Sequence, residues 1–197
     1  MEKAVILDMD GVIRHLDREV AENASRLKGF DFEELMDVIW DNEPGYELLC
    51  GRSTRDIWWE QVQSLDSRLN GLTQDFFWKE VLAKNYYDRE IIEFVRGIRQ
   101  HFVTGILTNC DRESKLEIIR NLGPDHPFEQ ILSSSDFGAV KPEERIFHSL
   151  LETLDVKPES CIFFDDRIKH VEGARAVGIQ AHLFEGIEQL RKLVRPT

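Results

Sequence analysis

Two carboxylates stand close together near the start of the chain, directly after a short apolar run. The run Ala4–Leu7 is followed by Asp8 and Asp10, and Gly11 comes next. Like charges in one site repel each other and raise each other's pKa values. A cation that offsets this repulsion is therefore expected, and oxygen ligands of this kind suit Mg²⁺ better than zinc.

Three further polar clusters occur later in the chain, and they are Thr108-Asn109, Lys141-Pro142 and Asp165-Asp166. Each lies in a loop or at the carboxyl end of an expected strand. In an open α/β sheet, ligands bind in the crevice outside those strand ends. All three clusters are therefore expected to converge on the first carboxylate pair.

Together the four clusters supply the parts of a phosphoryl-transfer site. One carboxylate can attack phosphorus while its neighbour handles the proton of the leaving group. Lys141 brings a positive charge of the kind that binds phosphate, and Thr108 and Asn109 offer donors to phosphoryl oxygens. The candidate ligands for Mg²⁺ are Asp8, Asp10, Asp165 and Asp166.

Short apolar runs separated by helical patterns predict the elements that position these clusters. The expected strands are Ala4–Leu7, Val103–Leu107, Gln130–Leu132, Cys161–Phe164 and Ala181–Phe184. Such brief, near-continuous runs are typical of strands buried on both faces of a parallel sheet. The expected helices are Asp88–Gln100 with Asp88 as N-cap, Ser114–Leu122, Glu143–Leu154 and Val171–Val177. This alternation predicts an α/β fold with a Rossmann-like core, in which helices flank a mostly parallel sheet.

One long interval interrupts the alternation. No strand is expected over Gly11–Asp88, which is far longer than a single crossover helix needs to be. Its helix starts are indicated at Asp31, Thr54 and Thr73. All four tryptophans lie in it, and we expect them to pack between its helices. The predicted organisation is a catalytic core of residues 1–13 and 88–197, with a helical cap of residues 14–87 inserted after the first strand.

Composition restricts the classes of partner. The 197 residues carry a formal net charge of −12, which argues against nucleic acid and anionic membrane. No apolar stretch reaches the ~20 residues needed to span a bilayer. The first residues lead straight into a strand without a secretory pattern, and the three cysteines lack CxxC spacing. We therefore expect a cytoplasmic monomer with reduced thiols.

The sequence resembles a known superfamily. DMDGV at 8–12, LTN at 107–109, VKP at 140–142 and FFDDR at 163–167 resemble the four ordered motifs of the haloacid dehalogenase-like hydrolases. The resemblance runs over the whole chain, and four motifs in order are far more specific than DxD alone. The segment Cys50–Thr54, with Trp58-Trp59 after it, is most similar to a phosphatase subgroup. That subgroup includes sugar-phosphate phosphatases and the phosphatase domain of soluble epoxide hydrolases.

The resemblance implies a role for each carboxylate. Asp8 would be the nucleophile that forms an aspartyl-phosphate, and Asp10 would be the general acid/base. Asp8, the backbone carbonyl of Asp10 and Asp166 would hold Mg²⁺. Asp165 would be a further ligand or would lie behind the ligands.

Other positions take their expected roles from the same resemblance. Thr108 and Lys141 would grip the phosphoryl group. His170 stands where many relatives carry a second acidic residue or an Asn, and we expect it on the helix surface or behind the metal ligands. Cys110 is expected to be a small packing residue and not a nucleophile.

The predicted function is an Mg²⁺-dependent phosphatase that acts on a sugar phosphate or similar small phosphomonoester. A phosphosugar mutase on the same core is the main alternative, with Arg52 and Arg55 as its candidate cap arginines. A receiver-type signalling module fits less well. In a receiver the acidic pair follows the first strand and the Lys follows the last, whereas here an acidic pair lies late in the chain and Lys141 precedes it. The helical insertion also fits a receiver badly. A true haloacid dehalogenase does not keep the second Asp of the first motif, so Asp10 argues against that activity.

Overall fold

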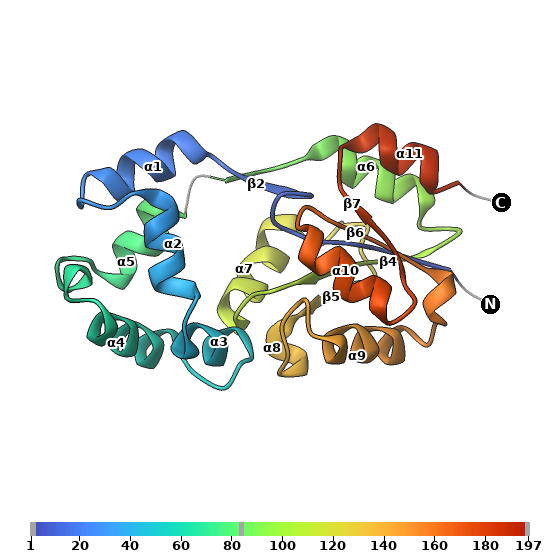
Figure 1. The fold of residues 1–197 in the computed structure, drawn as a ribbon. Coiled ribbons are helices and arrows are strands. Elements are labelled where there is room, and N and C mark those ends of the chain that lie inside the picture. Colours follow the sequence, from blue (N-terminus) through green and yellow to red (C-terminus); the bar gives the residue numbers. More distant parts are fainter. Residues whose placement is uncertain (1–2, 83–84, 196–197) are drawn as a thin grey trace.

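The computed structural model describes residues 3–82 and 85–195. Figure 1 shows a sheet with its flanking helices on one side and a separate group of helices on the other. Two neighbouring segments of chain join the two bodies, and both chain ends lie on the side of the sheet. We refer to the first body as the core and to residues 18–82 as the helical segment.

The core contains a parallel sheet of five strands in the order β5-β4-β1-β6-β7. The strands are β1 (Ala4–Leu7), β4 (Val103–Thr108), β5 (Gln130–Ser133), β6 (Cys161–Asp165) and β7 (Gln180–Leu183). All five were predicted, each within one residue at either end. Because β1 lies between β4 and β6, the carboxyl ends of these three strands are neighbours. This is the strand-order switch at which α/β sheets bind ligands.

Helices cover both faces of the sheet. The core helices are α6 (Arg89–Ile98), α7 (Arg112–Leu122), α8 (Ser134–Phe137), α9 (Glu144–Leu154), η3 (Pro158–Ser160), α10 (Ile168–Ala176) and α11 (Ile187–Leu193). Along β1, Ala4 and Ile6 pack against α9 and α10, whereas Val5 and Leu7 pack against α6, α7 and α11. Both faces of β1 are fully covered, as its continuous apolar run predicts.

Two of the four predicted core helices begin earlier than expected. Helix α7 begins at Arg112 and not at Ser114, because Asp111 caps it by accepting hydrogen bonds from the backbone N–H groups of Glu113 and Ser114. Helix α10 begins at Ile168 and not at Val171. The first turn of α7 is polar, so its apolar periodicity starts only in the second turn. Helix α10 opens with the exposed Ile168, and two polar residues separate it from Val171.

The prediction that Gly11–Asp88 contains no strand was wrong. Strands β2 (Arg14–Leu16) and β3 (Asn85–Tyr87) form an antiparallel ribbon, which is the connection seen in Figure 1. Each strand has three residues and mixes polar with apolar side chains. Such strands carry no readable alternation, and their pairing partner lies far away in the sequence.

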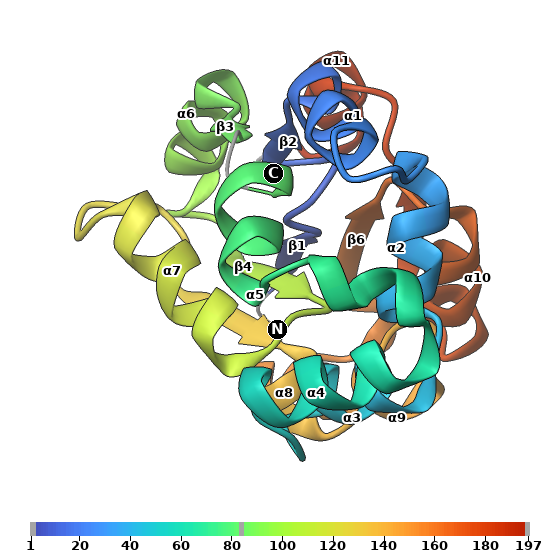
Figure 2. The same ribbon diagram turned by 90° about the vertical axis from the view of Figure 1, so that its left-hand side faces the viewer.

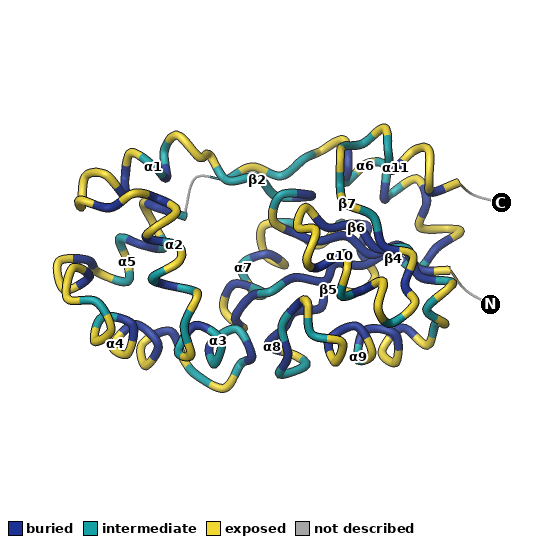
Figure 3. Tube along the Cα trace, viewed as in Figure 1, coloured by how far each residue is buried: buried dark blue, intermediate teal, exposed yellow. Residues whose placement is uncertain are grey.

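The helical segment has its own interior. Its elements are α1 (Arg18–Arg26), α2 (Phe32–Trp40), α3 (Glu43–Leu49), α4 (Arg55–Leu65), η1 (Ser67–Gly71), α5 (Gln74–Phe76) and η2 (Phe77–Val81). The predicted N-caps Asp31, Thr54 and Thr73 all accept a hydrogen bond from their helix. The inward faces are buried and the outer faces exposed, as Figure 3 shows.

Aromatic rings fill that interior. The Trp58 ring stacks on Trp40 at a centroid distance of 5.0 Å and lies 6.1 Å from Phe77. Trp59 and Trp78 complete the group, with centroids 6.0 and 5.4 Å from Phe77. The expected packing role of the four tryptophans is therefore confirmed.

Candidate active site

Three carboxylates meet at the carboxyl ends of two neighbouring strands. Asp8 follows β1, Asp165 ends β6, and Asp166 comes next. Each offers an oxygen that lies within 4.8 Å of the oxygens of the other two. The convergence follows from topology, because β1 and β6 pair in parallel with Leu7 beside Phe164.

A buried lysine lies against this group. The Lys141 side chain has 0% exposure, and its Nζ donates to Asp8 Oδ1 and to Asp165 Oδ2, each at 2.7 Å. A third bond, of 3.0 Å, goes to the carbonyl oxygen of Leu107. Burial by itself lowers the pKa of Lys141, but the two carboxylates outweigh that cost and raise it. Lys141 is therefore a permanent cation at this point.

The loop that carries Lys141 is held against its neighbours on two sides, by Asn109 after β4 and by helix α10. Asn109 donates from Nδ2 to the Lys141 carbonyl oxygen at 3.0 Å and accepts from the Lys141 N–H at 2.8 Å. On the other side, a Cβ atom at Gly173 of α10 would lie 2.4 Å from the carbonyl oxygen of Pro142. Only glycine lets α10 approach the loop this closely.

Asp165 is held by more partners than either neighbouring carboxylate. Its oxygens accept from Lys141, from the Arg167 N–H at 2.9 Å and from His170 Nδ1 at 3.0 Å. Burial alone raises the pKa of Asp165, but the hydrogen bonds from His170 and Lys141 together lower it. An ionised carboxylate can only accept, so Nδ1 is the protonated nitrogen of His170.

His170 was expected on the helix surface or behind the ligands, and the surface alternative was wrong. The residue is 4% exposed and lies under Asp165. Burial lowers the pKa of His170, which favours the neutral ring, whose Nδ1–H donates to Asp165.

The surroundings of Asp8 favour its ionised form less than those of Asp165 do. Burial raises the pKa of Asp8, and the charge of Asp165 adds to that effect, while Lys141 offsets only part of it. The Met9 N–H donates to Asp8 Oδ1 at 2.7 Å. A second cation beside Asp8 would restore its ionised form at neutral pH.

Asp166 points toward the first motif. Gly11 has φ +82°, and a Cβ atom there would lie 2.2 Å from Asp166 Oδ2. Glycine at position 11 therefore provides both the turn and the space for this carboxylate. Among the described residues, no side chain forms a hydrogen bond with Asp166, and burial and Asp165 both raise its pKa.

This donor set fits a hard divalent cation. It consists of carboxylate oxygens from Asp8, Asp165 and Asp166, with neither sulfur nor imidazole in the group. The oxygens of Asp165 already accept hydrogen bonds from Lys141, Arg167 and His170. The oxygens of Asp8 and Asp166 are therefore freer to bind a metal. The Asp10 side chain lies outside the group.

Asp10 instead forms an ion pair with a residue that sequence reasoning missed. Arg14 donates from Nε to Asp10 Oδ1 at 2.7 Å and from Nη2 to Asp10 Oδ2 at 2.9 Å. The Asp10 side chain is 58% exposed, whereas Asp8 is buried. The signal available in the sequence for this pair was an acidic and a basic residue four positions apart.

The two polar residues after β4 differ in their use. Thr108 is 1% exposed and ends the strand opposite Ser133 of β5, beside β1 in the sheet. Asn109, by contrast, uses both ends of its amide on the backbone of Lys141. Next to them, burial raises the pKa of the Cys110 thiol, which lies in the apolar core as expected.

Arg55 reaches from the helical segment into the core. It donates to both oxygens of Asp111, at 3.1 and 3.3 Å, and to Ser114 Oγ at 2.8 Å. Its guanidinium lies 3.8 Å from the centroid of Trp78. Arg52 pairs with Glu47 and donates to the carbonyl oxygen of Gly138 at 3.1 Å. Both arginines considered for a mutase therefore have protein partners here.

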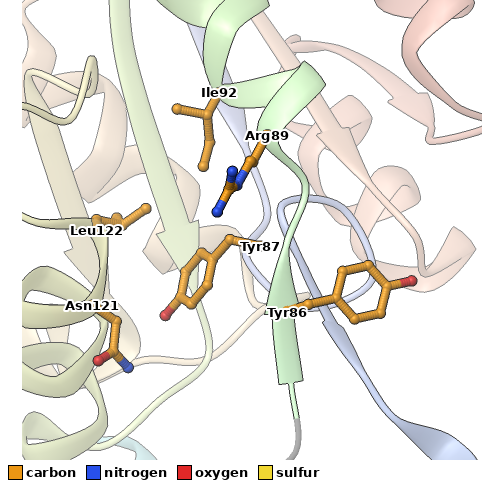
Figure 4. A pocket seen from close by; sticks show the side chains of 6 residues that line it. All are labelled: Tyr86, Tyr87, Arg89, Ile92, Asn121 and Leu122. Atoms are coloured by element: carbon orange, nitrogen blue, oxygen red, sulfur yellow. The ribbon is translucent and has the colours of Figure 1, made fainter.

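A surface hollow lies near the ribbon and outside the carboxylate group. It measures about 360 Å³, and its lining residues are Tyr86, Tyr87, Arg89, Ile92, Asn121 and Leu122. Figure 4 shows the Tyr87 hydroxyl pointing toward Asn121 of α7.

No described helix is long and apolar enough to cross a bilayer.

Known proteins share the sequence and the fold. The chain is 27% identical to a phosphatase of Mycobacterium tuberculosis, with 95% of this chain and 89% of that protein covered. It is 26% identical to a phosphorylated carbohydrates phosphatase of Thermotoga maritima, with 90% and 82% covered. Among solved structures, an enzyme of the same superfamily from Bacteroides thetaiotaomicron, in complex with magnesium and inorganic phosphate, superposes with a TM-score of 0.74. That match has 18% identity and covers 92% of this chain and 93% of the other, which supports the fold.

The family assignment follows from the sequence as a whole. Residues 2–178 match the family described as haloacid dehalogenase-like hydrolase, a span that contains all four motifs. The resemblance seen in the motifs is thereby confirmed. The chain belongs to the haloacid dehalogenase-like hydrolases.

Proposed function

We propose that this protein is an Mg²⁺-dependent phosphatase that hydrolyses a small phosphomonoester through an aspartyl-phosphate. The carrying observation is the position of Asp8, which lies 2.7 Å from buried Lys141 and within a group of three carboxylates. The names of the Mycobacterium and Thermotoga relatives support phosphate ester hydrolysis, and the second favours a phosphorylated carbohydrate.

Asp8 is the proposed nucleophile. Its carboxylate oxygen forms a bond to phosphorus while the bond between phosphorus and the ester oxygen breaks. That oxygen takes a proton from Asp10, which in this step is protonated on one oxygen and keeps its contact with Arg14 through the other. In the second half, Asp10 takes a proton from the water that attacks the aspartyl-phosphate. Inorganic phosphate and free Asp8 are the products.

The remaining residues prepare Asp8 for this step. Lys141 holds one Asp8 oxygen and supplies a positive charge. Asp165 accepts from Lys141, and His170 in turn donates to Asp165. We assign Asp8, Asp166 and the Asp10 carbonyl to the metal, with Asp165 next to them. Bound Mg²⁺ would neutralise the crowded carboxylates and the phosphoryl oxygens. Thr108 is the proposed hydrogen-bond donor to a phosphoryl oxygen. Asn109 acts by holding the backbone of Lys141.

The proposed cap is residues 14–87. Figure 2 looks onto the helical segment, behind which the sheet lies. Its α3–α4 turn is docked on the core, because Ser134 Oγ donates to the Leu49 carbonyl oxygen at 2.7 Å and also accepts from the Cys110 N–H. Substrate choice is expected to depend on this segment.

The pairing of Arg52 and Arg55 with protein groups favours the phosphatase over the mutase. We also propose that the protein is a cytoplasmic monomer; its three cysteines are free and buried.

The decisive test combines metal removal with Asp8→Asn. We expect p-nitrophenyl phosphate hydrolysis to stop in chelator and to return with Mg²⁺, which should also raise the melting temperature of the wild type. Asp8→Asn should abolish turnover while the protein stays folded. After rapid acid quench of the wild type, mass spectrometry should find phosphate on Asp8.

The matched control is Asp37→Asn, which changes an exposed Asp of the helical segment and should leave turnover intact. Full turnover by Asp8→Asn, or full turnover of the wild type in chelator, would refute the proposal.

A further inference from the structure

The general acid/base proposed above does not stand free. Arg14 grips Asp10 with a two-pronged ion pair in which the Arg14 side chain is 18% exposed and the Asp10 side chain 58%. A bidentate pair fixes the plane of the carboxylate as well as its distance, which a single contact does not. The orientation of Asp10 is therefore set from outside its own loop.

The backbone of Arg14 is itself fixed to the first motif. Its N–H donates to the Met9 carbonyl oxygen at 2.7 Å, and its carbonyl oxygen accepts from the Gly11 N–H at 2.8 Å. Asp10 and Arg14 also form an isolated bridge between their backbones. The guanidinium therefore projects from a base that is rigid with respect to Asp8 and Asp10.

The same residue opens the ribbon that carries the helical segment. Arg14 pairs with Tyr87 of β3, and the neighbouring Asp88 N–H donates to the Ile13 carbonyl oxygen at 2.8 Å. Figure 4 shows Tyr87 directed toward α7 of the core. Arg14 thus lies where the two bodies join, with its backbone in the ribbon and its side chain at the site.

We propose that Arg14 is a positioning residue for Asp10 and that it links the orientation of this carboxylate to the β2–β3 ribbon. The inference rests on the proposed function, because Asp10 transfers a proton only in that reaction. A displacement of about 1 Å in a reacting group can cost up to about 100-fold in rate. Loss of the grip is therefore expected to lower kcat and to leave KM and Mg²⁺ affinity nearly unchanged.

A kinetic double-mutant cycle tests the proposal with p-nitrophenyl phosphate as substrate. The proteins are the wild type, Arg14→Gln, Asp10→Asn and the double variant. Arg14→Gln should lower kcat about 10-fold or more in the wild type, but less than about 2-fold when Asp10 is already Asn. Arg14→Lys, which keeps the charge and loses the fork, should fall between Arg14→Gln and the wild type.

Arg18→Gln is the matched control, because Arg18 pairs with Glu22 in α1 at an exposed site away from the carboxylates. Its kcat should equal that of the wild type. Melting temperatures of all variants separate loss of fold from loss of positioning.

The outcomes distinguish the two proposals. Additive losses in the cycle, or a fall in Mg²⁺ affinity equal to the fall in kcat, would overturn the role of Arg14 and leave the phosphatase intact. An Asp10→Asn protein with unchanged kcat would overturn both the role of Asp10 and the inference built on it.

Discussion

The core and the helical segment achieve burial by different chemistry. At the carboxyl edge of the sheet, the core buries charges, with Lys141, Asp8 and Asp165 all at 6% exposure or less. The helical segment buries rings, and the ion pairs within it, such as Arg68 with Asp66 and Glu34, are partly or largely exposed. A buried charge network specifies one geometry, because each group depends on the others. An aromatic interior depends on shape and tolerates more change.

The difference suggests a division of labour. The buried charges hold one geometry at the carboxyl edge of the sheet, whereas packed rings hold the helical segment together. All four tryptophans lie in the helical segment, so their fluorescence reports its unfolding separately from far-UV circular dichroism, which reports the whole chain. Urea titrations with both probes can therefore follow the two regions at once.

Loss of Lys141 should produce the largest effect. Lys141→Met leaves Asp8 and Asp165 buried without their cation, and breaking such a pair costs about 3–5 kcal/mol. The free energy of unfolding, measured by circular dichroism without Mg²⁺, should fall by that amount, and turnover should be lost. Lys115→Met is the control, since its partly exposed pair with Asp136 should contribute less than about 1 kcal/mol. Equal losses in both variants would contradict the buried network.

Loss of an aromatic ring should act on the other region. Trp58 is fully buried, and Trp58→Ala should destabilise the helical segment by about 3 kcal/mol through the cavity that it leaves. The fluorescence transition should shift to lower urea further than the circular dichroism transition. Leu27→Ala, at a side chain with 82% exposure, should shift neither. If both probes shift together for Trp58→Ala, the two regions unfold as one unit.

The smallest of these effects is expected at the junction. Arg55→Ala removes charged hydrogen bonds to Asp111 and Ser114. The loss should be about 2 kcal/mol, because Asp111 still accepts from the backbone N–H groups of Glu113 and Ser114. The two transitions should then move apart, since this contact joins the regions. Arg68→Ala, which removes an exposed ion pair within the helical segment, should cost less than about 1 kcal/mol and leave the separation unchanged.

Most of the core was predictable because its signals are local. The continuous apolar runs gave the five strands within one residue, since a strand covered on both faces must be apolar throughout. Asp8, Lys141 and Asp165 could be placed together because strand order brings the carboxyl ends of β1 and β6 side by side. The Trp packing could be predicted because all four tryptophans lie in the one interval with helix signals of its own.

The missed features depend on pairings that are distant in sequence or on atoms of the backbone. The β2–β3 ribbon joins two three-residue strands without a pattern. The contact of the Asn109 amide with the Lys141 main chain could not be read from residue types, and the phosphate contact of Asn109 stays a prediction. Burial of His170 depends on a helix that starts three residues earlier than its apolar pattern. Arg55 finds Asp111 only through tertiary packing.

The ribbon makes the insertion a module that can be exchanged. Its strands are antiparallel partners in register, with Leu16 opposite Asn85, so chain entry and exit lie side by side. A short hairpin turn between these two residues would close the chain without moving the first motif or α6. Insertions from relatives of different lengths can be grafted at the same two points. The ribbon thus fixes the two points at which the chain leaves and re-enters the core, whatever the length of the segment between them.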